Sequence, residues 1–250
     1  MKKLRLSLLT ACILSITTTT YAALDANHGN YKGEVPCPPQ LILKDGLYVG
    51  AQAGYDSYRV VNDTDFVNVD PDLTFAFDPR LNASGGVGGA FVGFGHYFTS
   101  FHNVYLGFEM FGNGSGAETD SQVLAQSLIS PAFTKYSTDI EVKSNYGLSL
   151  LPGFKLNNAT LVYVRLGYNW TNIDVNDYIL VNTAVVANSI YDVTSSGFNY
   201  GLGLETAVVP NVSVRGEFTH TDYSNFTTYV GTKVDPQDNQ FMLALILHLS

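Results

Sequence analysis

Six charged residues are the strongest candidates for chemistry in this 250-residue sequence. Each lies on the polar side of a segment in which apolar and polar residues alternate, so strands would turn all six toward one interior. A buried charge without a partner costs several kcal/mol, so we expect these side chains to pair in a hydrogen-bonded ion network that fixes the strand register. The network comprises Glu109, Lys155, Arg165, Glu205, Arg215 and Glu217.

Other reactive residue types do not predict an active site. His220 and Ser224 come nearest to a base and its nucleophile, but their spacing does not ensure hydrogen-bond reach. The remaining histidines considered, His96, His102 and His248, are isolated, and no cluster has the spacing of metal ligands. We therefore expect no enzyme activity, no cofactor and no metal.

A group of acidic residues lies between the first two alternating segments. It lacks the glycine and the terminal glutamate of a calcium-binding loop, so we expect a solvated acidic loop. The group consists of Asp63, Asp65, Asp70 and Asp72.

Eight segments with a period of two residues must position the charged side chains. No run in the chain after residue 22 is long enough for a membrane helix, which needs about 20 apolar residues, because the longest spans residues 241–247. The remaining way to satisfy the backbone in lipid is a closed barrel, and we predict an all-β, eight-stranded antiparallel up-and-down transmembrane β-barrel. The segments are residues 46–58, 84–98, 103–111, 141–155, 160–170, 197–208, 211–221 and 240–249.

A soluble β-sandwich also alternates, so two further features favour lipid. The polar sides are rich in glycine, as a narrow interior requires. Aromatic residues stand near the ends of the apolar faces, where an interfacial girdle would lie. These aromatic residues are Tyr55, Tyr97, Trp170, Tyr200 and Phe241.

The connections alternate between short and long, as in bacterial outer-membrane barrels with periplasmic turns and long extracellular loops. We expect residues 178–181 and 184–186 to continue two strands above the membrane, and residues 123–129 to form a short helix. The four long loops, taken as residues 57–83, 112–138, 171–193 and 222–236, hold 12 acidic and four basic residues. An electrostatic partner of these loops should be basic or bridged by cations.

Composition limits the function classes. Only 14% of the residues are charged and the net charge is −9, with no Lys/Arg cluster beyond residues 1–5, which argues against a nucleic-acid partner. The apolar content of 46% argues against disorder.

The chain divides into three parts. Residues 1–22 combine basic residues, an apolar stretch and small residues before a cleavage point, which indicates a signal peptide. Residues 23–45 form a periplasmic lead-in, and residues 46–250 form the barrel with its four extracellular loops. Cys37 would be alone after cleavage, so no intramolecular disulfide is expected.

Three short motifs carry a family resemblance. Residues 105–110 (YLGFEM), preceded by residues 89–93 (GAFVG), resemble a strand of OmpA-type transmembrane domains. Residues 215–223 (RGEFTHTDY) resemble the penultimate strand of opacity-type surface antigens and their OmpX/OmpA-like relatives. In OmpA-type barrels, buried ion pairs are proposed to gate a narrow ion path, so the resemblance adds gating to the structural interpretation of the six charged residues.

The predicted function is that of a monomeric bacterial outer-membrane surface protein. Its long loops favour adhesion, host interaction or an envelope-structural role, and a narrow ion channel is the alternative. A lipid-modifying enzyme is the weakest hypothesis. The expected partners are outer-membrane lipid or lipopolysaccharide, the barrel-insertion machinery and a ligand at the loops.

Overall fold

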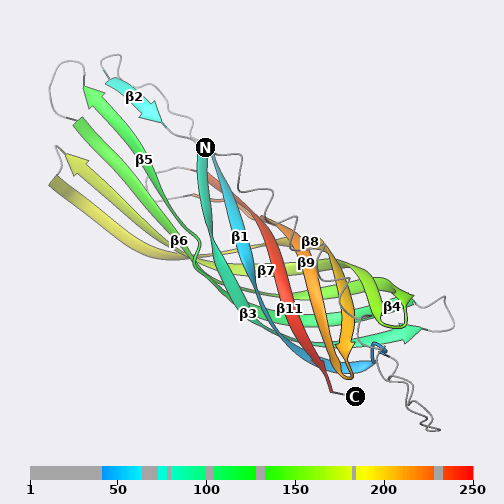
Figure 1. The fold of residues 1–250 in the computed structure, drawn as a ribbon. Helices are drawn as coiled ribbons and strands as arrows, with labels where there is room; N and C mark the ends of the chain where they lie inside the picture. Colours follow the sequence, from blue (N-terminus) through cyan, green and yellow to red (C-terminus); the bar gives the residue numbers. More distant parts are fainter. Residues whose placement is uncertain are drawn as a thin grey trace, which may run out of the picture. The chain divides into compact units, whose positions relative to one another are not determined.

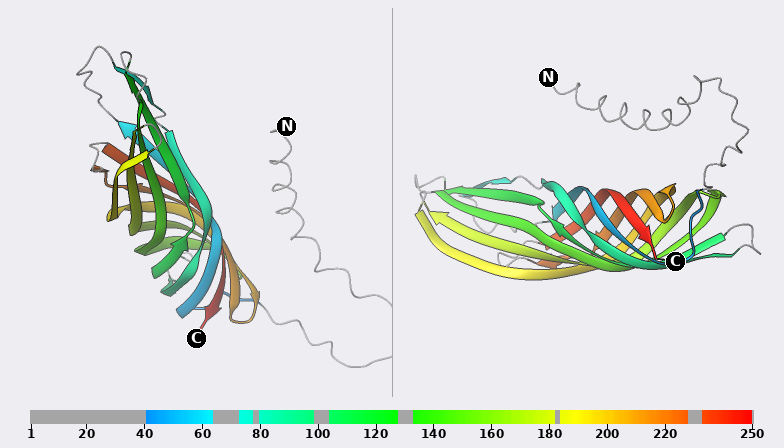
Figure 2. Two further views of the ribbon diagram at one scale, coloured as in Figure 1. Left: turned by 90° about the vertical axis from the view of Figure 1, so that its left-hand side faces the viewer. Right: turned by 60° about the horizontal axis from the view of Figure 1, so that its bottom comes forward.

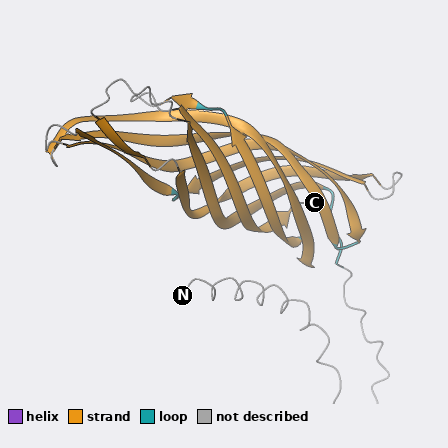
Figure 3. Cartoon of the chain, turned by 90° about the horizontal axis from the view of Figure 1, so that it is seen from above, coloured by secondary structure: helices purple, strands orange, loops and turns teal. Residues whose placement is uncertain are grey.

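The computed structural model describes residues 41–63, 73–77, 80–98, 104–127, 133–181, 184–227 and 233–249. Eight strands pair antiparallel in chain order, and β1 closes the ring by pairing with both β3 and β11 (Figures 1 and 3). The predicted eight-stranded antiparallel barrel is confirmed. The ring consists of β1 (Gly46–Asp63), β3 (Arg80–Phe98), β4 (Val104–Ser115), β6 (Phe133–Asn157), β7 (Thr160–Val181), β8 (Ala184–Val209), β9 (Val212–Tyr223) and β11 (Lys233–His248).

Alternation along each strand separates an apolar outer face from a mixed interior. On β4, Leu106 and Met110 are 45% and 51% exposed, whereas the intervening Glu109 is fully buried. Of the predicted girdle, Tyr55, Tyr200 and Phe241 are exposed. Tyr97 was wrongly placed there, because its ring turns inward and packs against Tyr105 with 4.8 Å between centroids.

Tight turns join the strands at one end. Residues 158–159 connect β6 to β7, and residues 210–211 connect β8 to β9. Asn211 has a φ of 69°, and asparagine tolerates this left-handed conformation better than most residues. We call this the short-turn end and the opposite one the long-loop end.

Five strands form an open sheet beyond the ring at the long-loop end (Figures 1 and 2). Its order is β2-β5-β6-β7-β8, where β2 is Leu73–Phe77 and β5 is Glu118–Ser127. The pairing of Leu180 with Val185 confirms that residues 178–181 and 184–186 continue β7 and β8 as strands. The helix predicted for residues 123–129 is wrong, because residues 123–126 pair with the extended β6 as a strand. A short β10 (Phe226–Thr227) pairs with β11.

Two apolar layers fill the interior at different heights. Along β7, Leu161 and Tyr163 come first, Arg165 follows, and Ile173 and Val175 come last. The lower apolar layer, at the short-turn end, contains Leu43, Tyr97, Tyr105, Leu151, Leu161, Tyr163 and Ala207. The upper apolar layer contains Tyr58, Ala83, Ala117, Ile140, Val142, Ile173, Val175 and Tyr223.

The segment before β1 reaches the lower apolar layer. Leu43 is 2% exposed, and its amide donates to the carbonyl of Asn158 at 3.0 Å. The predicted signal peptide, Cys37 and residues 23–40 of the predicted lead-in lie outside the described residues. In the ranges that the structure describes, no helix is long and apolar enough to cross a membrane.

Candidate functional site

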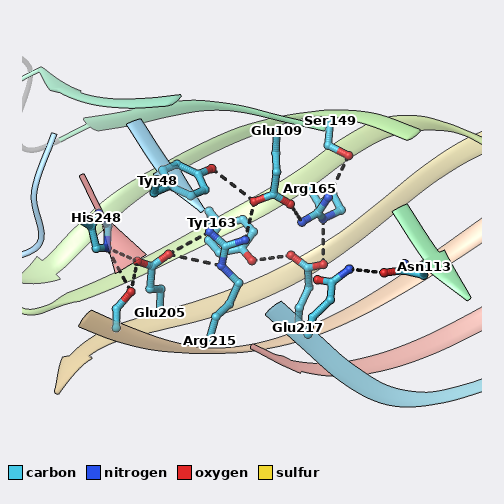
Figure 4. A network of polar contacts seen from close by, with 12 residues as sticks. Tyr48, Glu109, Asn113, Ser149, Tyr163, Arg165, Glu205, Arg215, Glu217 and His248 are labelled. Atoms are coloured by element: carbon cyan, nitrogen blue, oxygen red, sulfur yellow. Dashed lines mark hydrogen bonds and ion pairs between the residues drawn. The ribbon is translucent and has the colours of Figure 1, made fainter. Parts of the chain in front are cut away.

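Five of the six predicted charged residues meet in the lumen (Figure 4). Arg215 lies at the centre: its Nη1 is 2.6 Å from Glu109 Oε2, and its Nη2 is 3.0 Å from Glu205 Oε2. Arg165 pairs with Glu109 on one side and places its Nε 2.8 Å from Glu217 Oε1 on the other. These five side chains, from β4, β7, β8 and β9, form one continuous chain of ion pairs, which we call the lumen network.

Neutral groups complete the network. Tyr163 donates to Glu217, and Tyr48 donates to Glu109 at 3.3 Å. Ser149 accepts from Arg165 at 3.0 Å, and Ser213 donates to Glu205 at 2.6 Å. Every carboxylate of the network therefore has at least one neutral donor besides a guanidinium, as buried charges require.

Lys155, the sixth predicted member, lies apart from the other five. Its Nζ is 3.6 Å from the centre of the Tyr97 ring and donates to the carbonyl of Leu43 at 3.4 Å. The alternation gave the correct face of β6 but not the height: Lys155 pairs with Leu161 and therefore lies beside the lower apolar layer.

His248, which was not among the six predicted residues, contacts the lumen network instead. Its Nε2 lies 3.2 Å from Glu205 Oε1 and 3.1 Å from Ser213 Oγ, and the residue is buried. The sequence predicted an isolated histidine, although its place on the polar side of the last segment could have identified it. Both Ser213 and Glu205 face the same ring nitrogen, whereas a hydrolytic triad needs them on opposite nitrogens.

Of the other sequence candidates, His220 and Ser224 do not pair as a base and its nucleophile, and His102 lies outside the described residues. His220 contacts Asn239 through Nδ1 and Asp222 through Nε2, whereas Ser224 donates to the carbonyl of Ser196. Among the described residues, no group of three or more His, Cys, Asp or Glu side chains could hold a metal ion.

The acidic loop between the first two alternating segments lies only partly within the described residues. Asp63, at the end of β1, pairs in register with Lys233. Asp65, Asp70 and Asp72 lie outside the described residues.

A second polar layer lies between the lumen network and the upper apolar layer, and we call it the amide layer. Gln52 donates to Asn113 at 2.7 Å, and Asn113 donates to Asn145 at 2.9 Å. Asn169 and Asn199 both donate to Thr221 Oγ1, at 3.2 and 2.9 Å. Two carboxylates, Asp56 and Asp238, are fully buried at this level. The sequence prediction did not include these residues.

The space between the lumen network and the amide layer is small. Residues of both, including Arg165, Glu217, Asn113 and Gln240, line a cavity of about 10 Å³. By this measure the cavity is large enough for about one water molecule. At this level the lumen is therefore packed by side chains, as expected of an eight-stranded barrel.

The family model described as "Outer membrane protein beta-barrel domain" matches residues 41–246. One similar solved structure is that of Ail from Yersinia pestis in complex with the heparin analogue sucrose octasulfate. Ail is 14% identical to this chain, the match covers 81% of this chain and 98% of Ail, and the TM-score is 0.37. Neisserial surface protein A is 12% identical, with 82% and 97% covered and a TM-score of 0.39. OprG from Pseudomonas aeruginosa is 16% identical, with 82% and 97% covered and a TM-score of 0.36.

A search of curated proteins gave no match. The family model spans most of the chain and includes the whole closed ring, apart from the last residues of β11. The chain therefore belongs to the outer membrane protein beta-barrel family and resides in the bacterial outer membrane.

Proposed function

We propose that this protein is a surface-binding protein that captures an extended polypeptide segment along the outer edge of β8. The observation that carries this proposal is the pairing of β8. It pairs with β7 from Ala184 onward, but with β9 only from Gly197 onward. On its side away from β7, residues 184–194 pair with no strand in the part of the chain that the structure describes. Such an edge presents backbone donors and acceptors to an added strand.

Apart from a bulge between Val185 and Ala187, the edge lacks the usual protection against strand addition. Natural edges are blunted by proline, lysine, bulges or short length. Residues 184–194 contain no proline and no lysine, and Asp192 is their only charge. Val185 and Ile190 are 58% and 68% exposed. This composition supports a binding role for the edge.

Charge on the outer face selects the chemistry of the partner. Glu118, Glu141, Asp174 and Asp192 are direct cross-strand neighbours on β5, β6, β7 and β8. Like charges directly opposite one another repel. Lys143 offsets part of this repulsion, with its Nζ 2.6 Å from Glu141 and 3.4 Å from Asp174. The row ends on the open strand at Asp192, where a basic side chain of an added strand would be its next neighbour.

The inner face of the same edge is largely apolar, although the Tyr191 hydroxyl donates to the buried Asp177 on β7. Tyr191 and Val193 pack against the upper apolar layer. An added strand would therefore place apolar residues on this face and basic residues on the outer face. A second copy of the chain fits poorly, because it would bring another acidic row next to the first. The proposed partner is an extended segment in which apolar and basic residues alternate.

Deletion of the extracellular hairpin tests this proposal. Asn172 pairs with Thr194, so removing residues 173–193 and joining the ends by a two-residue turn deletes the recognition residues of the edge and preserves the lower register. In lipid nanodiscs, we expect an alternating Val/Lys peptide to bind the intact protein at least tenfold more tightly than this variant. A Val/Glu peptide and a scrambled Val/Lys peptide should bind neither.

The matched control removes β2, the strand at the other edge of the sheet, which among the described strands pairs with β5 alone. This variant should retain peptide binding. Equal binding by the hairpin deletion and the intact protein would refute the proposal, as would loss of binding in the β2 deletion alone.

A narrow ion channel is the second candidate. The filled lumen and the continuous ion network support a closed barrel instead. In planar bilayers we expect no conductance steps from the intact protein, and regular steps that Glu109→Ala alters would favour the channel.

A further inference from the structure

The lumen network carries one more negative than positive charge. Its members are three carboxylates and two guanidinium groups, so one negative charge is left over. Lys155 does not balance this charge, because its ammonium group lies over the Tyr97 ring and interacts with Asp45 at the short-turn end. A buried net charge is costly unless a further cation compensates it.

One carboxylate oxygen of the network is open to such a cation (Figure 4). Glu109 contacts two guanidinium groups, whereas Glu205 contacts that of Arg215 alone. This contact uses Oε2 of Glu205, which faces Nη2 at 3.0 Å and Nε at 3.3 Å. The other oxygen, Oε1, faces no guanidinium or ammonium group in the described part of the chain. Its partners are Ser213 Oγ at 2.6 Å and His248 Nε2 at 3.2 Å.

The directions of the hydrogen bonds place a proton on Nε2 of His248. The hydroxyl of Ser213 donates to Glu205, so its oxygen is left to accept from the imidazole. Both neighbours of Nε2 are therefore acceptors, and Nε2 is the donor. Nδ1 is buried without a partner among the described residues, so the contact at Nε2 is the one that favours a charged ring. A second proton, at Nδ1, would place an imidazolium 3.2 Å from a carboxylate oxygen.

The other titratable groups around this contact belong to residue types that ordinarily titrate elsewhere. Glutamate titrates near pH 4, tyrosine and lysine near pH 10 and arginine above pH 12, whereas histidine titrates between about pH 5 and 8. A proton taken up in that range is therefore assigned to His248. The surrounding groups are Tyr48 on β1, with its ring centre 6.0 Å from that of the imidazole, Tyr97 on β3, Tyr105 on β4, Lys155 on β6, Glu205 on β8 and Arg215 on β9.

We propose that His248 and Glu205 form a pH-sensitive link that fastens the end of β11, the strand that closes the ring against β1, to β8. The link crosses β9, which lies between these two strands. With the imidazole protonated, the lumen network is neutral and the hydrogen bond is charge-assisted, which makes it about twice as strong as a neutral one. Glu205 faces the ring only in the folded barrel. The link therefore stabilises the barrel at low pH, and this stabilisation is lost as the pH rises and His248 releases its proton.

Nuclear magnetic resonance of the imidazole nitrogens tests the protonation directly. The full chain carries isotope-labelled histidine in lipid nanodiscs, and the spectrum of His248→Gln assigns the signals of His248. We expect this ring to take up a proton as the pH falls, with a midpoint at least about one pH unit lower in Glu205→Gln, a tenfold loss of proton affinity. His96 is the matched control, because its partner is Asp45 outside the lumen network, and its midpoint should be the same in both proteins.

A second measurement keeps the test decisive if Glu205→Gln folds poorly. His248→Gln keeps a hydrogen-bond donor but cannot carry a charge. The urea midpoint of the intact protein should exceed that of His248→Gln by more at about pH 5.5 than at about pH 8.5, on either side of the histidine range. An equal difference at both pH values would overturn the proposal. It would also be overturned by a His248 ring that takes up no proton down to about pH 5, or by a midpoint that Glu205→Gln leaves unchanged.

Discussion

Arg215 is the residue whose removal tests the lumen network most severely. Its guanidinium contacts Glu109 at 2.6 Å and Glu205 at 3.0 Å and 3.3 Å, and all three side chains are buried. Arg215→Met keeps most of the side-chain volume but removes the positive charge. Glu109 retains Arg165, whereas Glu205 is left with Ser213 and His248 only.

The expected magnitude follows from these contacts. Removing one partner of a buried pair costs about 3–5 kcal/mol, because the remaining charge stays buried without compensation. We expect Arg215→Met to lower the free energy of unfolding by this amount. Replacing Glu205 with leucine in the same chain should recover at least about 1 kcal/mol, because the uncompensated carboxylate is then gone.

Urea unfolding in detergent micelles measures the effect, with the emission of Trp170, the single tryptophan, as the signal. Lys155→Met is the matched control, because Lys155 lies outside the lumen network, and it should cost less than about 1 kcal/mol. The reasoning would be refuted if the two variants lost the same stability, or if Arg215→Met lost less than about 1 kcal/mol.

Further predictions concern packing, the outer face and the lipid belt. The Cβ of Gly203→Val would collide with the buried Tyr163 ring, so the free energy of unfolding of this variant should fall by about 1–3 kcal/mol in the same assay. Gly112 has open space around it, so Gly112→Val should lower the free energy of unfolding by less than about 0.5 kcal/mol. Lys143→Met removes the cation between Glu141 and Asp174, so its stability should rise more steeply with salt than that of the intact protein. Brominated lipids should quench Trp170, because its ring lies in an outward cluster with Tyr146 and Tyr168; unquenched emission would contradict the position of the belt.

The ring was predictable because one face is largely apolar within most of the eight alternating segments. A shift of one residue would turn this face into the lumen, so alternation alone fixes the inner and outer positions. For the same reason, Glu109 and Arg165 could be assigned to the interior without knowledge of their partners.

Height within the barrel was not predictable in the same way. Alternation does not show that Lys155 stops beside Tyr97, or that His248 reaches Glu205, because these heights depend on bulges and on the stagger between strands. Tyr97 was misplaced because an aromatic residue near a strand end suits both a girdle and a lumen layer.

The strand at residues 118–127 was missed for a different reason. Its partner is the extension of β6, which begins six residues further along the chain at Phe133, and this pairing selects strand over helix there. The buried carboxylates could have been found, since Asp56 lies on the polar side of the first alternating segment. No sequence signal, however, shows that Asp238 lies diagonal to it.

Amide hydrogen exchange along β8 tests the central claim most directly. In nanodiscs, residues 184–194 should exchange faster than the doubly paired residues 197–206, because their outer backbone groups lack a partner strand. Adding the alternating Val/Lys peptide should slow exchange in residues 184–194 and leave the barrel wall unchanged. Unaltered exchange in these residues when the peptide is bound, with protection elsewhere, would contradict the account.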